Sequence, residues 1–181
     1  MTKSTIRKKI LKLKKNKNLK KYKIDIPLLI SILKKNNKKN FTVGGYYPVN
    51  NEISDLEILR ELIKNNIKVS LPVIRKNKDM NFYSWSFVEP LTINSYGIPE
   101  PIKSKIVIPD AIIVPLVAFD NNLFRLGYGG GFYDRYIAKI QKKNQIFTVG
   151  IAYSFQRINK VPVNKYDKKL NIVITEKNII K

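Results

Sequence analysis

Hydrophobic side chains recur at helical spacing in four stretches of the chain. The helices predicted from this pattern cover residues 6–13, 28–33, 54–65 and 133–143. A Lys- and Asn-rich connection joins the first two. We expect Ser54 to cap the third helix, because Glu57 follows three residues later and would complete a capping box.

Short apolar runs alternate with these helices and predict strands. They lie at residues 41–47, 69–73, 82–87, 112–116, 147–153 and 171–175. Several runs are apolar on both faces, which is typical of parallel strands buried between two layers of helices. We therefore predict one α/β domain over residues 1–181, with three layers, a mostly parallel central sheet and a Lys-rich helical segment at 1–40.

The composition narrows the chemistry, because the chain contains neither Cys nor His. Their absence excludes Cys/His zinc sites, Ser-His-Asp and Cys-His nucleophiles, disulfides and a histidine pH switch. Catalysis must then come from Asp, Glu, Lys, Arg, Tyr, Ser or Thr, from backbone dipoles, or from a bound cation such as Mg²⁺.

The net charge makes nucleic acid a candidate partner, because the chain contains 35 Lys and Arg but only 13 Asp and Glu, which gives +22. Only six of these basic residues are Arg, the side chain best suited to bidentate phosphate contacts, and 15 of the 35 lie in residues 1–40. We interpret most of the lysines as a solvated helix face, and a nucleic-acid-binding α/β protein stays as an alternative.

The chain shows no pattern of membrane insertion or secretion. The apolar stretch at 112–119 is far shorter than the roughly 20 residues of a membrane span, and no apolar core follows the basic N-terminal residues. We expect a cytoplasmic protein without a membrane partner.

A glycine cluster holds the strongest chemical signal. Four of the eight glycines, Gly127, Gly129, Gly130 and Gly131, fall within five positions just before a predicted helix. Such a loop lets backbone N–H groups converge on an anion, and the helix N-terminus favours negative charge. Arg125 and Arg135 bracket the loop, which strengthens the prediction of a phosphate site.

Asp134 is an acidic residue in this otherwise positive loop, and a Mg²⁺ ligand explains it more easily than a phosphate contact does. The alternative is a tight turn in which Asp134 pairs with Arg135 or caps the helix. The loop is not a Walker A motif, since no Gly-Lys-Ser/Thr follows, and it lacks the usual setting of the dinucleotide-binding fingerprint.

Ordered motifs extend from the loop in both directions. They are Asn81-Phe-Tyr-Ser-Trp85, Tyr96-Gly-Ile-Pro-Glu-Pro101, Pro109-Asp-Ala-Ile-Ile-Val-Pro-Leu-Val-Ala-Phe-Asp120, Arg125-Leu-Gly-Tyr-Gly-Gly-Gly-Phe-Tyr-Asp-Arg135, Val149-Gly-Ile-Ala-Tyr153, Gln156, Pro162, Asp167 and Val173-Ile-Thr-Glu176. In order and spacing, over about residues 41–176, they resemble the 5-formyltetrahydrofolate cyclo-ligase (5,10-methenyltetrahydrofolate synthetase) family. The chain departs from the family pattern at Tyr166, where His is frequent, and in a glycine loop without a cation at Tyr128 or Gly130.

The resemblance implies a Rossmann-like fold of the sugar-phosphate isomerase/CoA-transferase-like type. It also implies a ligase that uses ATP and Mg²⁺ to cyclise 5-formyltetrahydrofolate to 5,10-methenyltetrahydrofolate, releasing ADP and phosphate. The formyl oxygen attacks the γ-phosphate, and N10 of the folate then closes the ring. The reacting groups belong to the substrates, which suits a chain without His or Cys. We expect a monomer that takes folate with or without a polyglutamate tail and binds no specific nucleic acid.

The resemblance also assigns roles to residues. The ATP-binding set is Lys3, Ser4, Thr5, Ile6, Arg7, Arg125, Leu126, Gly127, Tyr128, Gly129, Gly130, Gly131, Phe132 and Tyr133. The folate-binding set is Tyr47, Glu52, Trp85, Tyr128, Gly129, Gly130, Gly131 and Phe132, although a lone Trp is as easily a core residue. Asp134 and Asp167 would hold Mg²⁺, and Arg125, Tyr133 and Asp134 would be catalytic. A homologue that binds these ligands without turnover remains another alternative.

Overall fold

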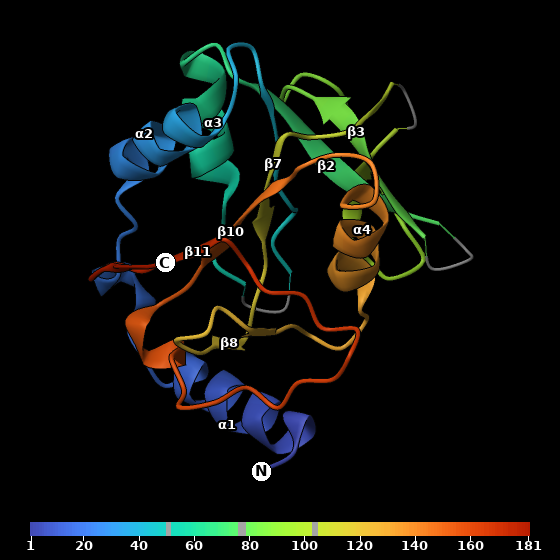
Figure 1. Cartoon of the computed structure of the whole chain (residues 1–181). Helices are drawn as coiled ribbons and strands as arrows, with labels where there is room; N and C mark the ends of the chain where they lie inside the picture. The colour runs from blue at the N-terminus through green and yellow to red at the C-terminus, as the bar shows by residue number, and fades with distance from the viewer. Residues whose placement is uncertain (50–51, 76–78, 103–104) are drawn as a thin grey trace.

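An eight-stranded sheet forms the middle layer of the molecule, with helices on both of its faces (Figure 1). The computed structural model describes residues 1–49, 52–75, 79–102 and 105–181. The strand order is β12-β11-β10-β7-β1-β2-β3-β6.

The helices are α1 (Lys3–Lys15), α2 (Ile26–Asn36), α3 (Leu56–Lys64) and α4 (Phe132–Ile140), with 3₁₀ turns η1 (Leu19–Lys21) and η2 (Ser154–Gln156). The sheet strands are β1 (Thr42–Gly44), β2 (Lys68–Ile74), β3 (Met80–Trp85), β6 (Ile106–Val107), β7 (Ala111–Val114), β10 (Phe147–Ile151), β11 (Ile172–Ile174) and β12 (Ile179–Ile180). Two further ribbons pair β4 (Leu91–Ile93) with β5 (Pro99–Pro101), and β8 (Ala118–Phe119) with β9 (Arg125–Leu126).

The five central strands run parallel, from β11 through β10, β7 and β1 to β2, and antiparallel strands extend both edges. All four residues of β7 are buried, as expected for a strand covered on both faces. The predicted α/β fold with a mostly parallel sheet is therefore confirmed.

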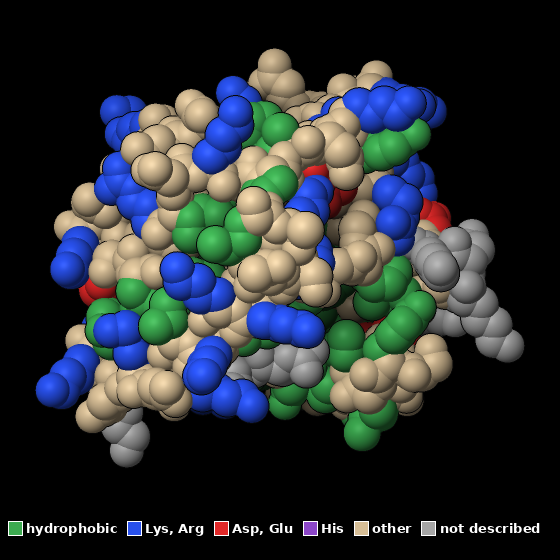
Figure 2. All heavy atoms as spheres, turned by 90° about the horizontal axis from the view of Figure 1, so that it is seen from below, with side chains coloured by type: hydrophobic (Ala, Val, Ile, Leu, Met, Phe, Trp, Pro, Cys, Tyr) green, Lys and Arg blue, Asp and Glu red, His purple; other side chains and the backbone are tan. Residues whose placement is uncertain are grey.

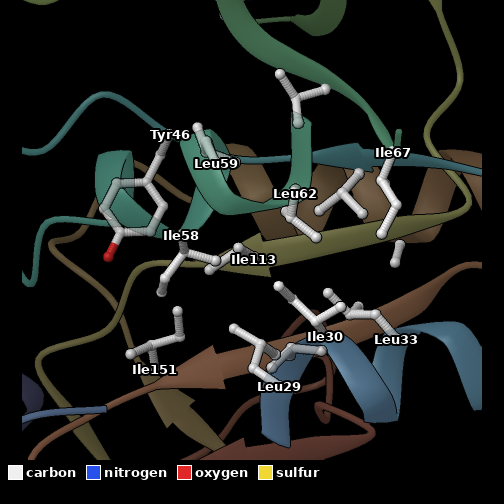
Figure 3. Close-up of a cluster of buried hydrophobic side chains, with 14 of the residues drawn as sticks. Leu29, Ile30, Leu33, Tyr46, Ile58, Leu59, Leu62, Ile67, Ile113 and Ile151 are labelled. Carbon is white, nitrogen blue, oxygen red and sulfur yellow. The ribbon is translucent and has the colours of Figure 1, made fainter. Parts of the chain in front are cut away.

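Helices α2 and α3 cover one face of the sheet (Figure 3). Leu29 and Leu33 of α2 and Leu59 and Leu62 of α3 are completely buried and pack in one cluster with strand residues such as Ile113. The Asp25 side chain starts α2 by accepting a hydrogen bond from the Leu28 N–H at 2.9 Å.

Helix α4 covers the other face, where Tyr136 and Ile137 pack with Phe82 and Ile112. Helix α1 covers neither face. It lies beside β8 (Figure 1), and Ile6 and Ile10 pack with Val117 and other residues of the β8–β9 region. This places the basic N-terminal helix beside the loops that follow the central strands.

The predicted helices and strands are all present, each within a few residues of its expected bounds. The predicted cap of α3 is wrong, because Asp55 and not Ser54 is the N-cap residue, and it makes no side-chain capping bond. Asp55 instead turns inward and accepts the Tyr46 N–H at 2.8 Å. Within the described part of the chain, no helix combines the length and apolar character of a membrane span.

Candidate active site

One cavity of about 760 Å³ opens where the central parallel strands end. Tyr46 and Tyr47 enter it after β1, Pro115 enters after β7, and the end of β2 lines it as well. The carboxyl edge of a parallel sheet is where open α/β folds bind their ligands. The glycine loop, the start of α1 and the segment 164–168 complete its walls.

The glycine loop forms a turn that needs glycine at two positions. Gly129 has φ +118° and Gly131 has φ +65°, conformations that side-chain-bearing residues rarely adopt. Gly131 is the N-cap residue of α4 and makes no side-chain capping bond. The loop therefore presents backbone and the open N-terminal end of a helix to the cavity, as anion sites do.

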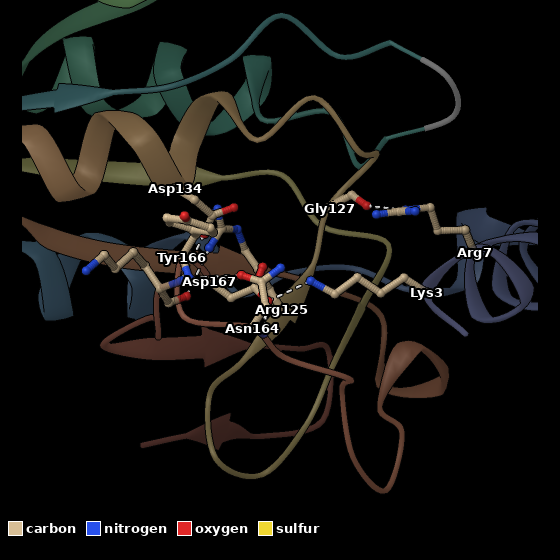
Figure 4. A network of polar contacts seen from close by, with 9 residues as sticks. Lys3, Arg7, Arg125, Gly127, Asp134, Asn164, Tyr166 and Asp167 are labelled. Atoms are coloured by element: carbon tan, nitrogen blue, oxygen red, sulfur yellow. Dashed lines mark hydrogen bonds and ion pairs between the residues drawn. The ribbon is translucent and has the colours of Figure 1, made fainter. Parts of the chain in front are cut away.

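Two cations of α1, Lys3 and Arg7, reach this region, and the resemblance to the family assigns both to the ATP-binding set (Figure 4). Arg7 donates from Nε to the carbonyl oxygen of Gly127 at 2.7 Å, and Lys3 donates from Nζ to Asp167 at 2.6 Å. Asp167 also accepts the Asn164 N–H at 2.6 Å. Helix α1 is thus joined both to the glycine loop and to segment 164–168.

Arg125 and Asp134 form an ion pair at 3.1 Å, in which the Arg125 side chain is 4% exposed and the Asp134 side chain 23%. Arg125 also donates to the Lys168 carbonyl at 3.1 Å, while the Lys168 N–H donates to Asp134 at 3.0 Å. Burial lowers the pKa of Arg125, and the Asp134 carboxylate acts in the opposite direction. The ion pair of Asp134 is with Arg125, across the loop, and this fixes the carboxylate at the first turn of α4.

The fit of a divalent cation rests on Asp134 and Asp167, which both line the cavity. Each already contacts a basic side chain, and the described residues contain no group of three or more carboxylates or other metal-ligating side chains. Mg²⁺ is commonly held by one or two carboxylates together with substrate phosphates and water. Two carboxylates at a phosphate-type loop fit that mode and do not form a closed protein cage.

Glu52 lies on the wall of the cavity, as does Tyr47. One carboxylate oxygen of Glu52 accepts the Val49 N–H at 2.9 Å. Burial raises the pKa of Glu52 to about 7, while the Val49 N–H and the positive charge of Lys14 act to lower it. This carboxyl group therefore changes charge near neutral pH.

Two tyrosines of the loop bring hydroxyl groups without protein partners. The hydroxyls of Tyr128 and Tyr133 are buried and make no hydrogen bond to any described residue. Burial raises the pKa of both, so they stay protonated and can donate. Both residues line the cavity, and buried donors without a protein partner are rare in folded proteins.

An aromatic wall closes another side of the cavity. The rings of Tyr96 and Phe132 meet edge to face at 5.8 Å, and the Arg135 guanidinium lies 5.2 Å from the Phe132 ring. Only Phe132 was predicted as a site residue. Tyr96 lies in a motif that the sequence already singled out, whereas Lys168 acts through its backbone, which no residue pattern reveals.

The structure does not bring every predicted residue to the cavity. Trp85 is 4% exposed in the core, contacts Phe87 with ring centroids 4.1 Å apart, and donates to the Glu89 carbonyl at 3.1 Å. Ile6 faces the core and packs with the β8–β9 region, and Ser4 and Thr5 are exposed. These four do not line the cavity, whereas the other predicted ATP, folate and metal residues do.

Basic side chains are spread over the face seen from below, and they do not gather in one patch (Figure 2). A duplex-binding protein concentrates its Lys and Arg along one surface. The arrangement on this face therefore does not favour the nucleic-acid alternative.

A parallel sheet with a glycine loop, converging cations and a helix N-terminus at its carboxyl edge is typical of α/β enzymes that bind phosphorylated ligands. The model of the 5-formyltetrahydrofolate cyclo-ligase family matches residues 1–176. The chain belongs to this family, and it is a ligase that cyclises 5-formyltetrahydrofolate to 5,10-methenyltetrahydrofolate.

Curated relatives and solved structures agree with this assignment. The 5-formyltetrahydrofolate cyclo-ligase of Haemophilus influenzae is 33% identical over 148 residues, which cover 78% of each chain. That of Escherichia coli K12 is 34% identical over 146 residues, 76% of this chain and 79% of the relative. The NMR structure of Aquifex aeolicus 5,10-methenyltetrahydrofolate synthetase matches with a TM-score of 0.79 and 33% identity, covering 99% of this chain and 92% of that one.

Proposed function

We propose that the cavity binds ATP and 5-formyltetrahydrofolate side by side and drives the cyclisation by phosphoryl transfer to the formyl oxygen. The observation that carries this proposal is that one cavity joins a glycine loop with two cations of α1 to a wall containing Glu52 and aromatic rings. The first part suits a polyphosphate, and the second suits a planar heterocycle. We also propose that the enzyme acts as a monomer.

The nucleotide half consists of the glycine loop, Lys3 and Arg7. The backbone around Gly129 and the N-terminus of α4 provide N–H groups for phosphate oxygens. Arg7, fixed on the Gly127 carbonyl, has further guanidinium N–H groups that can contact the same anion. Lys3 adds a charge at the other end of the same helix face.

The Mg²⁺ of the reaction would be held by Asp134 and Asp167, and when bound it neutralises charge on the transferring phosphoryl group. Arg125 keeps Asp134 oriented toward the cavity through their ion pair. Lys3 and the Asn164 N–H fix Asp167 in the same way. In this proposal, Arg125 acts by orienting Asp134.

The folate half places Glu52, Tyr47 and the loop tyrosines around the pterin and formyl groups. A carboxylate such as Glu52 accepts hydrogen bonds from the donor edge of a pterin ring. The hydroxyls of Tyr128 and Tyr133 remain protonated and lack protein partners, so they can donate to substrate oxygens. Trp85 is left out of this pocket because it lies in the core.

The chemistry then needs alignment more than proton transfer by side chains. The formyl oxygen attacks the γ-phosphorus and the bond to ADP breaks; N10 then attacks the formyl carbon, loses its proton, and phosphate leaves with the former formyl oxygen. The protein excludes water, holds the two ligands in line and stabilises negative charge with cations and backbone N–H groups.

Arg135 and Lys165 are exposed cations that line the cavity, and the Arg135 guanidinium lies against the Phe132 ring of the aromatic wall. Folate tails carry carboxylates, so we propose that these two residues contact the tail and that polyglutamylated folate is accepted. Comparing the KM of mono- and triglutamate substrates tests this role, and equal values in the wild type contradict it.

The direct test mixes the purified protein with 5-formyltetrahydrofolate, ATP and Mg²⁺ and follows the near-ultraviolet absorbance of the methenyl product. We expect turnover that requires all three. Glu52→Gln should raise the KM for folate with little effect on the KM for ATP. Binding of ATP or folate without any turnover would instead identify a non-catalytic homologue.

A further inference from the structure

Asp55 carries a carboxyl group that is completely buried beside the end of β1. The residue is 0% exposed, and its Oδ2 accepts the Tyr46 N–H at 2.8 Å. The backbone passes close by at this point, since a Cβ added at Gly45 would lie 2.7 Å from the same oxygen. An apolar side chain would fill this place without the cost of burying a carboxyl group. What the carboxyl group adds is the hydrogen bond to Tyr46.

This hydrogen bond lies where the pairing of β1 with β2 ends. The Gly45 N–H still donates to the carbonyl of Ser70 on β2 at 2.9 Å. The next amide along the chain, that of Tyr46, donates instead to Asp55 at the start of α3. The chain therefore leaves the sheet at Tyr46 and turns to the cavity, which Tyr46 and Tyr47 both line.

A second hydrogen bond holds Tyr46 through its side chain. The Tyr46 hydroxyl donates to the Ile53 carbonyl, and both residues are buried. Tyr46 is thus attached to Asp55 by its backbone and to Ile53 by its ring. Tyr47 directly follows Tyr46 in the chain, and Glu52 directly precedes Ile53. Each of these two folate residues is therefore the chain neighbour of a residue that is fixed here.

Glu52 is also bonded to Val49, but these bonds are local. The Glu52 N–H donates to the Val49 carbonyl at 2.9 Å, and the Val49 N–H donates to the Glu52 carboxylate at 2.9 Å. The partners are only three residues apart, so the bonds orient the carboxylate without attaching it to the sheet. The bonds of Tyr46 make that attachment, because they connect this stretch to the end of β1 and the start of α3.

We propose that Asp55 is a positioning residue for the folate half, which holds Tyr46 and thereby places Tyr47 and Glu52 in the cavity wall. The inference rests on the proposed roles of Tyr47 and Glu52 in folate binding. Asp55 does not line the cavity and acts through Tyr46. The nucleotide half is built from other elements, so removing this hydrogen bond should affect folate and not ATP.

Two replacements of Asp55 separate the hydrogen bond from the volume of the side chain. Asp55→Asn keeps an oxygen that accepts the Tyr46 N–H, whereas Asp55→Leu has a similar size and no acceptor. Burial raises the pKa of Asp55, and the Tyr46 N–H opposes this change, so an uncharged amide suits the buried position. Leu62→Ala is the matched structural control, because Leu62 is completely buried on the same helix and does not line the cavity.

The first test needs no substrate. Amide hydrogen exchange, measured by NMR in the free protein, reports on the Val49 N–H, which is bonded to Glu52 and not to Asp55. We expect the Val49 amide to exchange about 10-fold faster in Asp55→Leu, because this stretch opens locally when Tyr46 is released. Asp55→Asn and Leu62→Ala should retain the wild-type rate. An unchanged Val49 rate in Asp55→Leu overturns the inference.

The second test compares the two Michaelis constants. In Asp55→Leu, the KM for 5-formyltetrahydrofolate should rise about 10-fold with the KM for ATP unchanged, and Asp55→Asn should return it toward the wild-type value. Leu62→Ala should lower the Tm and leave both constants unchanged. A folate KM that rises equally in Leu62→Ala, or a KM for ATP that rises with it in Asp55→Leu, indicates a structural role and overturns the inference. Faster Val49 exchange with an unchanged folate KM supports the attachment and instead overturns the folate roles of Tyr47 and Glu52.

Tyr46→Phe provides a second variant in case Asp55→Leu does not fold. It removes only the hydrogen bond to Ile53 and keeps the ring in place. We expect the same pattern at a smaller size, with faster Val49 exchange and a folate KM raised about 3-fold. A wild-type Val49 rate together with a wild-type folate KM in Tyr46→Phe overturns the inference.

Discussion

Arg7 donates from Nε to the carbonyl oxygen of Gly127 at 2.7 Å, which joins the first helix to a loop 120 residues later in the chain. The guanidinium also lies beside Gly129, where an added Cβ would come within 3.7 Å of the Arg7 Cζ. Protein contacts therefore fix the two elements of the proposed phosphate site on each other.

Replacing Arg7 tests this link. Arg7→Met should raise the KM for ATP about 10-fold or more, because it removes both a charge and the hydrogen bond to Gly127, while the KM for folate changes little. Initial rates at varied ATP measure the effect. Lys8→Met is the matched control, since Lys8 is exposed on the same helix and should leave both constants unchanged. An equal KM for ATP in Arg7→Met and Lys8→Met would show that Arg7 does not contribute to ATP binding.

Gly129→Ala should destabilise the protein, because the residue at this position has φ +118°. Holding an alanine there costs about 1–3 kcal/mol, and thermal unfolding should show a lower Tm. Gly127→Ala is the control, because an added Cβ there meets open space and no left-handed backbone is required. A Tm for Gly129→Ala equal to that of the control would show that the loop relaxes without strain.

Asp134→Asn should mainly impair the use of Mg·ATP. The amide keeps the shape of the carboxylate but loses the negative charge that faces Arg125 at 3.1 Å. We expect kcat to fall by roughly 100-fold or more, with folate binding retained. Activity across a Mg²⁺ titration and folate binding by fluorescence measure the two effects, and circular dichroism checks the fold. Unchanged kinetics would refute the role of Asp134.

Much of the fold follows from local patterns in the sequence. The spacing of the leucines predicts helix α3, and the run that is apolar on both faces predicts strand β7. Both patterns reflect which faces of the element are buried. The short strands at the sheet edges, such as β6 and β12, carry no such pattern, since two paired residues depend on tertiary contacts. The N-cap residue of α3 is Asp55 and not Ser54. Its side chain accepts a tertiary hydrogen bond from the Tyr46 N–H, a contact that the local sequence does not reveal.

The site residues also divide into those that the sequence predicts and those that only the structure places. Glycine spacing and the i, i+4 pair Lys3 and Arg7 are visible in the chain, and the structure brings them to one cavity. Trp85 could not be placed from the sequence, because an aromatic residue in a strand faces either the core or a ligand. Lys14 looked like one more lysine of a solvated helix face, and only its burial against Tyr153 separates it from its neighbours.

Lys14→Met should make the protein more stable at neutral pH. The pKa of Lys14 falls from 10.5 to about 8 on folding, so the unfolded chain binds more protons between these values and stability rises with pH there. The cost of the buried ammonium is fully present below pH 8 and disappears as the pH approaches 10.5. Methionine removes this cost, and we expect a gain on the order of 1 kcal/mol at pH 7.

The check is the difference in Tm between Lys14→Met and wild type as a function of pH. It should be positive at pH 7 and shrink above pH 8, whereas Lys15→Met, which changes an exposed lysine, should show no such trend. A lower Tm for Lys14→Met at every pH would mean that the lysine contributes to packing.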